Sequence, residues 1–520
     1  MKHHICHARH LSKLVRVQRF AIILSCLWLL TAAFAQTVVI AQQLEHGSLN
    51  PADLRGLSDN TVSRTMFEGL IGLDRDLNLV PELATSWEGN DDATELTFSL
   101  REGVSFHDGT PFDAEAVKAY FDWASDPDNP LGGRARNIFV DVATVEVIDP
   151  LTVKFTLSKP NGAMIYNFTL ANGRILSPAA IETYGEDISR NPVGTGPFEF
   201  QEWIDGQQIT VTAFDGYWGD PAQVEAIEFR VVPNDATRIA LLQSGEAHFI
   251  EMVPPPLVAA LELSPDITVE ASKSVFARIF PMNTQVEPFN DVRVRQAMNH
   301  AINREQLVAV ALQGFGTAMT APFLEPVFGY SPQPEYEFDL ERARELLAEA
   351  GYPDGFSATV LTFNSDEFRT VGQILQQMLS EVNITLELQP TERGALVDAI
   401  FKPFEESELQ TSLVGASTST GDGDLAIRTS FITAAWPPAR NNWSFYSNER
   451  VDEITDAASA TSDQALRAEL YAEAQEIIWN DAPWMFLYSP DNLAAHANEL
   501  NGVFYMPSRY VDARAASISE

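Results

Sequence analysis

Two carboxylates spaced two residues apart stand in the most open stretch of the chain and are the first candidates for chemistry. Residues 415–424, GASTSTGDGD, carry only small side chains and the acids Asp422 and Asp424. Such residues let a guest approach the backbone closely and leave N–H groups free to donate. The loop follows an expected strand at 409–414, and ligands of α/β domains lie beyond the carboxyl ends of strands. The stretch therefore predicts the floor of a binding pocket, with a solvated connecting loop as the alternative.

Recognisable catalytic and metal-binding motifs are missing. The chain has no G-x-S-x-G elbow, no H-E-x-x-H pair, no phosphate loop and no dinucleotide-binding glycine pattern. Asp422 and Asp424 could begin a calcium loop, but Ala426 stands at the fifth position and no glutamate at the twelfth. The histidines beyond residue 35 are isolated in sequence, at positions 46, 107, 248, 300 and 496. We expect a binding protein without metal or cofactor. An exported hydrolase remains the alternative of another class, since a triad can assemble in space.

The first 35 residues predict a cleaved secretory signal. A basic start precedes an apolar run at 20–30 and the sequence Ala-Phe-Ala at 33–35, so the mature chain would begin at Gln36. A retained membrane anchor is the weaker interpretation, because the run is shorter than the ~20 residues that span a bilayer. Both cysteines, Cys6 and Cys26, lie in this segment. The mature chain would therefore have neither disulfides nor thiol chemistry.

The chain is long and strongly acidic. Its 520 residues are too many for one core and predict two or three domains. The formal net charge is −38, and removing the five basic residues of the signal takes it to −43. Such a charge disfavours nucleic acids and anionic membranes as partners, although a few arginines could still bind an anionic ligand locally.

Hydrophobic periodicity predicts alternating strands and helices. The expected strands are 37–41, 96–100, 209–213, 226–232, 247–250, 358–362, 384–388 and 484–488, with a hairpin over 145–157. The expected helices are 63–70, one capped by Asp113, 235–244, one capped by Asp291, 339–350, 366–382 and 466–479. The β/α/β order after residue 339 indicates an α/β fold with a parallel or mixed sheet covered by helices.

Short motifs along nearly the whole mature sequence carry a family resemblance. They are FEGL at 67–70, LATSW at 83–87, LREGV at 100–104, DGTPF at 108–112, NPVGTGPF at 191–198, YW at 217–218, MN at 282–283, VR at 292–293 and AGYP at 350–353. With these motifs the chain resembles the family 5 solute-binding proteins of ABC importers, which carry peptides, glutathione, nickel chelates or related solutes. Further segments resemble the glutathione-binding subgroup: ASDP at 124–127, GEA at 245–247, WPP at 436–438, FYSN at 445–448 and IIW at 477–479.

The resemblance implies a two-lobed periplasmic binding protein of the large class II type, with mixed sheets, a hinge between the lobes and an extra subdomain. The first lobe is expected at 36–75, 191–275 and 496–520, the extra subdomain at 76–190 and the second lobe at 276–495.

The resemblance also implies a ligand-binding set. In dipeptide-binding relatives an aspartate of a Gly-Asp-x-Asp motif takes the ligand amine, and residues 421–424 match this motif, so Asp422 is the first candidate. Arg369 falls where those relatives place an arginine that grips the peptide carboxylate, with a solvent-facing helix arginine as the alternative. Many relatives have Gly-Trp before the acidic motif, whereas this chain has Gly415-Ala416, which implies a wider or less aromatic pocket.

Four further residues complete the expected site. Arg278 is expected either to reach a second carboxylate or to form an interlobe salt bridge. Trp436 is expected to pack against the ligand or inside the core. Asp424 flanks the amine site, and Asn60 is a candidate hydrogen-bonding residue of the first lobe.

The expected function is capture of a short peptide or glutathione-like solute in the periplasm by lobe closure, and its delivery to an ABC permease and its ATPase subunits. A monomer is expected. The alternatives are a nickel-chelate binder of the same family, the exported peptide hydrolase, and a sensor or chaperone that uses the same cleft.

Overall fold

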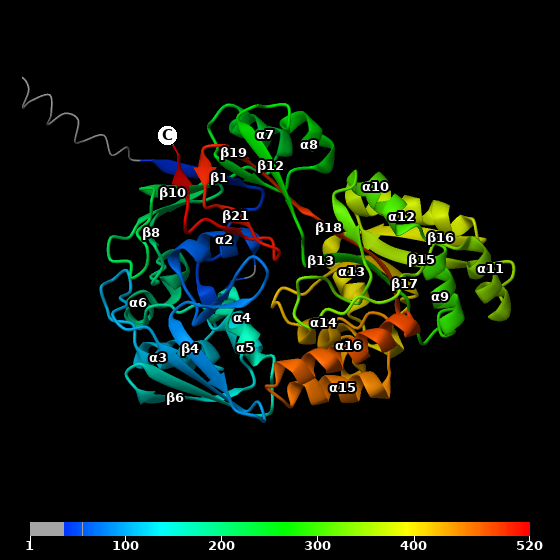
Figure 1. Ribbon diagram of the computed structural model, residues 1–520, viewed down its shortest axis with the longest axis horizontal. Coiled ribbons are helices and arrows are strands. Elements are labelled where there is room, and N and C mark those ends of the chain that lie inside the picture. The colour runs from blue at the N-terminus through cyan, green and yellow to red at the C-terminus, as the bar shows by residue number, and fades with distance from the viewer. Residues whose placement is uncertain (1–35, 55, 520) are drawn as a thin grey trace, which may run out of the picture.

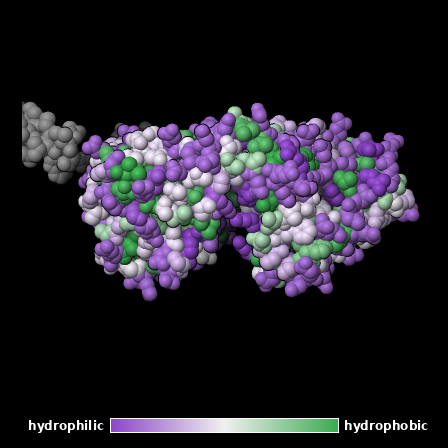
Figure 2. All heavy atoms as spheres, turned by 90° about the horizontal axis from the view of Figure 1, so that it is seen from below, coloured by the Kyte–Doolittle hydropathy of each residue, from purple (hydrophilic) through white to green (hydrophobic). Residues whose placement is uncertain are grey.

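The computed structural model describes residues 36–54 and 56–519, which form two lobes with a separate sheet in each (Figure 1). The predicted signal at 1–35 lies outside the described residues. The surface in Figure 2 is mostly hydrophilic and is notched between the two halves. Within the described residues, no helix is both long and apolar enough to cross a membrane.

The first lobe is built on a seven-stranded mixed sheet of order β12-β19-β11-β1-β10-β9-β8. Its central strand β1 runs parallel to both β10 and β11, and the remaining pairs are antiparallel. The strands are β1 Thr37–Gln42, β8 Phe198–Ile204, β9 Gln208–Ala213, β10 Ala226–Val231, β11 Phe249–Glu251, β12 Ile267–Ser272 and β19 Asn492–Ala497. The helices of this lobe are α2 Leu57–Met66, α7 Asp235–Gln243 and α8 Pro255–Leu261.

A smaller subdomain with an antiparallel sheet of order β4-β5-β7-β6 is attached to this lobe. Its elements are β4 Ala84–Gly89, β5 Glu95–Leu100, β6 Val142–Asp149, β7 Thr152–Leu157, α3 Ala114–Ser125, α4 Gly133–Ile138, α5 Met164–Asn167 and α6 Pro178–Tyr184. Five buried phenylalanines fill its core with ring centroids 4.8–5.6 Å apart: Phe98, Phe121, Phe139, Phe155 and Phe168. Such edge-to-face pairs each add about 0.5–1.5 kcal/mol beyond area burial.

The second lobe carries a six-stranded sheet of order β14-β18-β13-β17-β15-β16. Strand β15 runs parallel to β16 and β17, so the predicted β/α/β arrangement is confirmed. The strands are β13 Phe276–Pro281, β14 Gly316–Ala318, β15 Phe356–Phe363, β16 Ile384–Thr391, β17 Thr411–Ser417 and β18 Trp484–Pro490. The helices are α9 Val292–His300, α10 Arg304–Leu312, α11 Leu340–Glu349, α12 Asp366–Ser380, α13 Arg393–Ile400, α14 Gly423–Ser430, α15 Glu449–Ser459 and α16 Gln464–Asp481.

The chain crosses between the two large sheets at two adjacent places. One crossing joins β12 to β13 through residues 273–275, and the other joins β18 to β19 at Asp491. The Ser489 hydroxyl donates to the carbonyls of Ser274 and Phe276, both at 2.9 Å, so the crossings are hydrogen-bonded to each other. The lobe boundaries stay a prediction. The crossing at Asp491 precedes the expected boundary at 495/496 by four residues.

Helix starts show how local sequence sets the elements. Asp113 and Asp291 each accept a hydrogen bond from a backbone N–H of the helix that they precede, as predicted, and Asp339, expected as the first residue of its helix, does the same for α11. The helix predicted at 63–70 was misplaced, because α2 spans Leu57–Met66. Most of α2 is buried, polar residues included, so it has no solvent-facing stripe that could mark its period.

Gly162 of the subdomain makes a backbone contact with the second lobe. Its N–H donates to the carbonyl of Ser459 at 2.9 Å, and a Cβ at this position would overlap the carbonyl oxygen of Thr461. We expect Gly162→Ala to hold the lobes apart and to weaken ligand affinity at least tenfold, with the melting temperature of the free protein changed little. Isothermal titration and thermal unfolding measure both. Gly394→Ala in α13 is the matched control, since a Cβ there meets no atom within 4 Å. Unchanged affinity in Gly162→Ala would show that this contact takes no part in closure.

Candidate functional site

The acidic motif stands at a junction between a strand and a helix. β17 ends at Ser417, residues 418–422 turn, and α14 begins at Gly423 with Asp422 as its N-cap. Gly421 has φ +81°, a left-handed conformation that suits glycine. The neighbouring segment at Phe328 secures the turn, since Phe328 N–H donates to Gly421 and Gly423 N–H donates to Phe328, at 2.9 and 3.0 Å.

The prediction of free backbone N–H groups in this loop holds only in part, since within the turn only the N–H groups of Ser419 and Thr420 lack a hydrogen-bond partner among the described residues. The N–H groups of five residues all have partners inside the protein: Thr418, Gly421, Asp422, Gly423 and Asp424. The turn is short because β17 and α14 take up half of 415–424, and most N–H groups next to the two elements are used inside the protein.

Asp422 is buried and ion-paired. Its carboxylate is 1% exposed and lies against the guanidinium of Arg467 in α16, which is fully buried, with Nη2 to Oδ2 at 2.9 Å. Its Oδ1 accepts hydrogen bonds from Asp424 N–H, the Arg467 guanidinium and the Tyr471 hydroxyl, at 2.8, 3.0 and 3.1 Å. These contacts fix the position of the carboxylate between α14 and α16.

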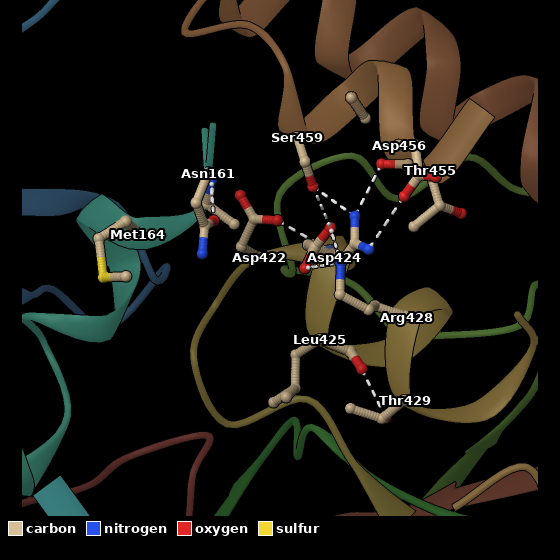
Figure 3. Close-up of polar contacts among 12 residues, drawn as sticks. Asn161, Met164, Asp422, Asp424, Leu425, Arg428, Thr429, Thr455, Asp456 and Ser459 are labelled. Atoms are coloured by element: carbon tan, nitrogen blue, oxygen red, sulfur yellow. Dashed lines mark hydrogen bonds and ion pairs between the residues drawn. The ribbon is translucent and has the colours of Figure 1, made fainter. Parts of the chain in front are cut away.

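The second oxygen of Asp422 can accept a further hydrogen bond. Oδ2 is buried and lies 2.9 Å from Arg467 Nη2 as part of the ion pair, but it accepts no hydrogen bond of good geometry from the described residues. Figure 3 shows this oxygen pointing toward Asn161, which belongs to the subdomain of the other lobe. Burial raises the pKa of Asp422 to about 6, with a further contribution from the Asp424 charge, against the opposing effect of Arg467. The carboxylate thus lacks full compensation and would gain from a cation.

Asp424 has a partner of its own. Its carboxylate lies 3.1 Å from Arg428 Nε, and Arg428 also reaches the Thr455 carbonyl, Asp456 and Ser459 (Figure 3). Through Arg428 the pair ties α14 to α15, so Asp424 acts inside the lobe, and its own N–H donates to Oδ1 of Asp422.

Arg467 was missed by the sequence analysis, although α16 itself was predicted. The signal was present, because Arg467 falls in phase with the buried stripe of α16: Tyr471, Ala474, Gln475, Ile478 and Trp479. An arginine on the buried stripe of a helix needs a buried carboxylate. The sequence does not say which carboxylate that is.

The other expected ligand residues are scattered. Arg369 lies at the exposed start of α12, with a side chain 46% exposed and paired to Asp366 at 2.7 Å. Trp436 packs against Phe404 and Phe445, and its Nε1 donates to the Tyr446 carbonyl, so its contacts are those of core packing. In the first lobe, Asn60 Oδ1 is buried without a hydrogen-bond donor among the described residues.

Arg278 pairs within its own lobe. Its Nε and Nη2 donate to the two carboxylate oxygens of Glu367 at 2.6 and 3.1 Å, and both residues belong to the second lobe. The alternative of an interlobe salt bridge was therefore wrong, because the acid nearest to Arg278 stands at the start of α12 and not on the first lobe.

An apolar cavity of about 480 Å³ lies between the subdomain and the second lobe. Tyr166 and Phe328 line it from opposite lobes with stacked rings, their centroids 6.0 Å apart. Burial and the Asp422 charge both raise the pKa of Tyr166, which places this wall beside the carboxylate. Within residues 36–54 and 56–519, no group of three or more His, Cys, Asp or Glu side chains could hold a metal ion.

Two lobes joined by adjacent crossings, with a buried acid where they meet, define a two-lobed solute-binding protein. The family model described as bacterial extracellular solute-binding proteins, family 5 Middle, matches residues 78–452. The chain belongs to this family, whose members are the solute-binding proteins of ABC importers, and the predicted resemblance and fold class are confirmed.

Three relatives illustrate which proteins the chain is similar to. The glutathione-binding protein GsiB of Salmonella paratyphi A is 38% identical over 483 residues, covering 92% of this chain and 93% of its own. HbpA2 from Haemophilus parasuis superposes with a TM-score of 0.85 at 27% identity, covering 93% of this chain and all of its own. DppA from Helicobacter pylori, solved in complex with the peptide STSA, has a TM-score of 0.76 at 28% identity, covering 93% and 98%.

Arg467→Ala should strongly destabilise the protein, because it leaves the Asp422 carboxylate buried without its counter-ion. Breaking a buried pair on one side costs about 3–5 kcal/mol. Urea unfolding followed by tryptophan fluorescence measures the loss. The double variant D422L/R467M removes both charges and should recover most of the stability. If Arg467→Ala unfolds at the wild-type urea concentration, the pair does not hold α14 to α16.

Proposed function

We propose that this chain captures a short peptide or a glutathione-like solute by closure of its lobes and delivers it to a membrane permease. The observation that carries the proposal is Oδ2 of Asp422. This oxygen is buried where the two lobes meet and accepts no hydrogen bond of good geometry from the described residues. A ligand ammonium would complete its coordination with a charge-assisted hydrogen bond in a water-poor site.

The surroundings suit an amine better than a second anion. Asp422 and Asp424 stand against Arg467 and Arg428, and the exposed Asp456 adds a further negative charge beside Arg428. One ammonium would therefore bring this cluster to neutrality. Tyr166 and Phe328 could enclose the apolar part of the ligand, in agreement with the cavity beside them.

The ligand carboxylates need cations elsewhere in the cleft. Arg369 remains a candidate, because within the described part of the chain it is ion-paired only with the highly exposed Asp366, and an exposed pair is readily exchanged. Arg278 is a second candidate, and Trp436, Asp424 and Asn60 are expected to shape the site around the bound solute.

Delivery follows from the class of protein. The chain would be exported through the signal at 1–35, act as a monomer in the periplasm and present its closed surface to an ABC permease with its ATPase subunits. The names of the GsiB and DppA relatives support a peptide or glutathione ligand. As a solute-binding protein it would carry out no catalysis of its own.

Isothermal titration with glutathione, a dipeptide and a nickel–histidine mixture tests the ligand class directly. Heat from glutathione or the dipeptide supports the proposal. Heat from the nickel mixture alone would replace it with nickel-chelate binding, and peptide cleavage during incubation would replace it with hydrolysis. Native mass spectrometry of the freshly purified protein identifies whatever co-purifies with it.

Asp422→Asn should reduce affinity for the amine-bearing ligand at least a hundredfold, because an amide cannot neutralise an ammonium. Titration of glutathione well below the melting temperature of the variant measures the loss. Asp463→Asn is the matched control, since Asp463 caps α16 at the protein surface and makes no ion pair in the described chain. Equal affinity of wild type and Asp422→Asn would remove the amine site from the proposal.

Affinity should also fall as the pH drops below about 6. The Asp422 carboxyl takes up a proton near its raised pKa of about 6, whereas a ligand ammonium favours the ionised form and must displace that proton. Binding at pH 5.5 should therefore release protons, and affinity should fall by up to tenfold per pH unit below 6. Titrations in buffers of different ionisation enthalpy measure the release.

The Asp422→Asn variant separates this effect from other groups. Glu68 also titrates in this pH range, since burial raises its pKa to about 7. It lies within the first lobe, where its carboxylate accepts hydrogen bonds from Tyr217 and Trp218. Residual binding by Asp422→Asn should show no proton release at pH 5.5. Equal proton release in the variant and in the wild type would assign the linkage to another carboxyl.

A further inference from the structure

Arg278 occupies the centre of the second sheet with one edge of its guanidinium unused. On β13 it stands directly opposite Tyr488 of β18 on one side and Gly415 of β17 on the other. Gly415 leaves room for the guanidinium, because a Cβ there would lie only 3.3 Å from Nη1. Glu367 takes the Nε and Nη2 edge, and Nη1 donates to no other described residue.

The Tyr488 hydroxyl beside it also lacks a partner. Tyr488 is fully buried, and its hydroxyl makes no hydrogen bond within the described chain. An unpaired buried hydroxyl costs about 1–3 kcal/mol, so an acceptor at this place would be stabilising. Among the described residues, neither the Tyr488 hydroxyl nor Arg278 Nη1 donates to an acceptor, and the two residues stand opposite each other on adjacent strands.

A second arginine approaches the same place from the first lobe. Arg509 lies in the turn between β21 Phe504–Tyr505 and β22 Val511–Asp512, and β22 contacts α2 of the first lobe. Asn492 holds this turn, since its amide donates to the Met506 and Pro507 carbonyls and its Oδ1 accepts from Arg509 Nε at 2.9 Å. The guanidinium lies over the Phe276 ring at 4.6 Å, and its two terminal nitrogens have no hydrogen-bond acceptor among the described residues.

Glu367 is hydrogen-bonded to Arg278, and its charge also acts on Arg509. Burial and the neighbouring charge of Arg278 lower the pKa of Arg509, while Glu367 acts in the opposite direction. One acid and two arginines leave an excess positive charge here. This place is the end of the interlobe region next to the crossings at 273–275 and Asp491, and we call it the hinge end. A carboxylate fits a guanidinium edge with two parallel hydrogen bonds and would relieve the repulsion between the arginines.

We propose that Arg278, Arg509 and the Tyr488 hydroxyl form an anion subsite that receives the ligand carboxylate farthest from the amine. The arginines come from opposite lobes, so the carboxylate joins the lobes across the hinge end. The subsite rests on the proposed function in one respect, the presence of a peptide-like ligand with its amine on Asp422. It makes Arg509 a specificity-determining residue for ligands with a free distal carboxylate.

Titration of glutathione and of its glycine monoethyl ester into four proteins tests the subsite. Wild type should bind glutathione at least tenfold more tightly than the ester. Arg509→Gln should lose at least tenfold in affinity for glutathione and bind the ester as wild type does, so that the preference disappears. Tyr488→Phe should lose about threefold for glutathione alone. Arg342→Gln, an exposed arginine of α11 paired with Glu345, removes the same charge far from the subsite and should behave as wild type.

Thermal unfolding of each variant accompanies the titrations. If Arg509→Gln does not fold, the affinity of Tyr488→Phe for glutathione tests the subsite instead, because removal of one hydroxyl oxygen leaves the packing of the ring in place. A preference for glutathione over the ester that persists unchanged in the folded variants overturns the subsite and leaves the proposed function standing. Failure of wild type to bind glutathione, its ester or a dipeptide overturns the proposed function instead.

Discussion

The buried ion pair between Asp422 and Arg467 is the constraint on which the site depends. Each charge has lost its water, and the desolvation of an ion costs several kcal/mol even after relaxation. The protein offsets this cost with the pair itself, the Tyr471 hydroxyl and the N-terminal backbone of α14. The hydrogen bonds converge on Oδ1, whereas Oδ2 has only the ion-pair contact with Arg467 Nη2 and no hydrogen bond of good geometry from the described residues. A carboxylate held this rigidly cannot turn to satisfy itself, which suits it to the proposed ligand ammonium.

The overall charge of the molecule does not decide what it binds. A formal charge of −38 repels anions at long range, yet salt at about 0.1 M screens exposed charges beyond about 10 Å. Inside the interlobe region the nearest charges therefore dominate. Asp422 lies at one end of this region, and Arg278 and Arg509 lie with Glu367 at the other end. This polarity would match the proposed zwitterionic solute better than a simple anion or a simple cation.

The sequence predicts elements better than it predicts partners. Strands and amphipathic helices with clear caps, such as β15, α11 and α12, were predicted closely because one face of each meets water. α2 was misplaced because nearly all of it is buried, and α15 and β19 were not predicted at all. The Gly-Asp-x-Asp motif at 421–424 identified Asp422 as a candidate. Its partner Arg467 lies 45 residues further along the chain and contacts it only through tertiary folding. Arg509 lies still further from Arg278, on the other lobe, where no periodicity relates the two.

Closure requires that the solute bind both lobes. A ligand shifts a two-state equilibrium only by its difference in affinity for the two states, so contacts confined to the second lobe would leave the lobes as they were. Asp422 belongs to the second lobe alone, and the proposed ammonium contact by itself would therefore not account for closure. At two places the first lobe could also contact the solute. One is the segment at Asn161 and Gly162, which faces Asp422, and the other is Arg509, which faces Arg278. They lie at opposite ends of the interlobe region. A solute that reaches both ends gains contacts available only when the lobes approach, and the spacing between its charges then becomes part of what the protein selects.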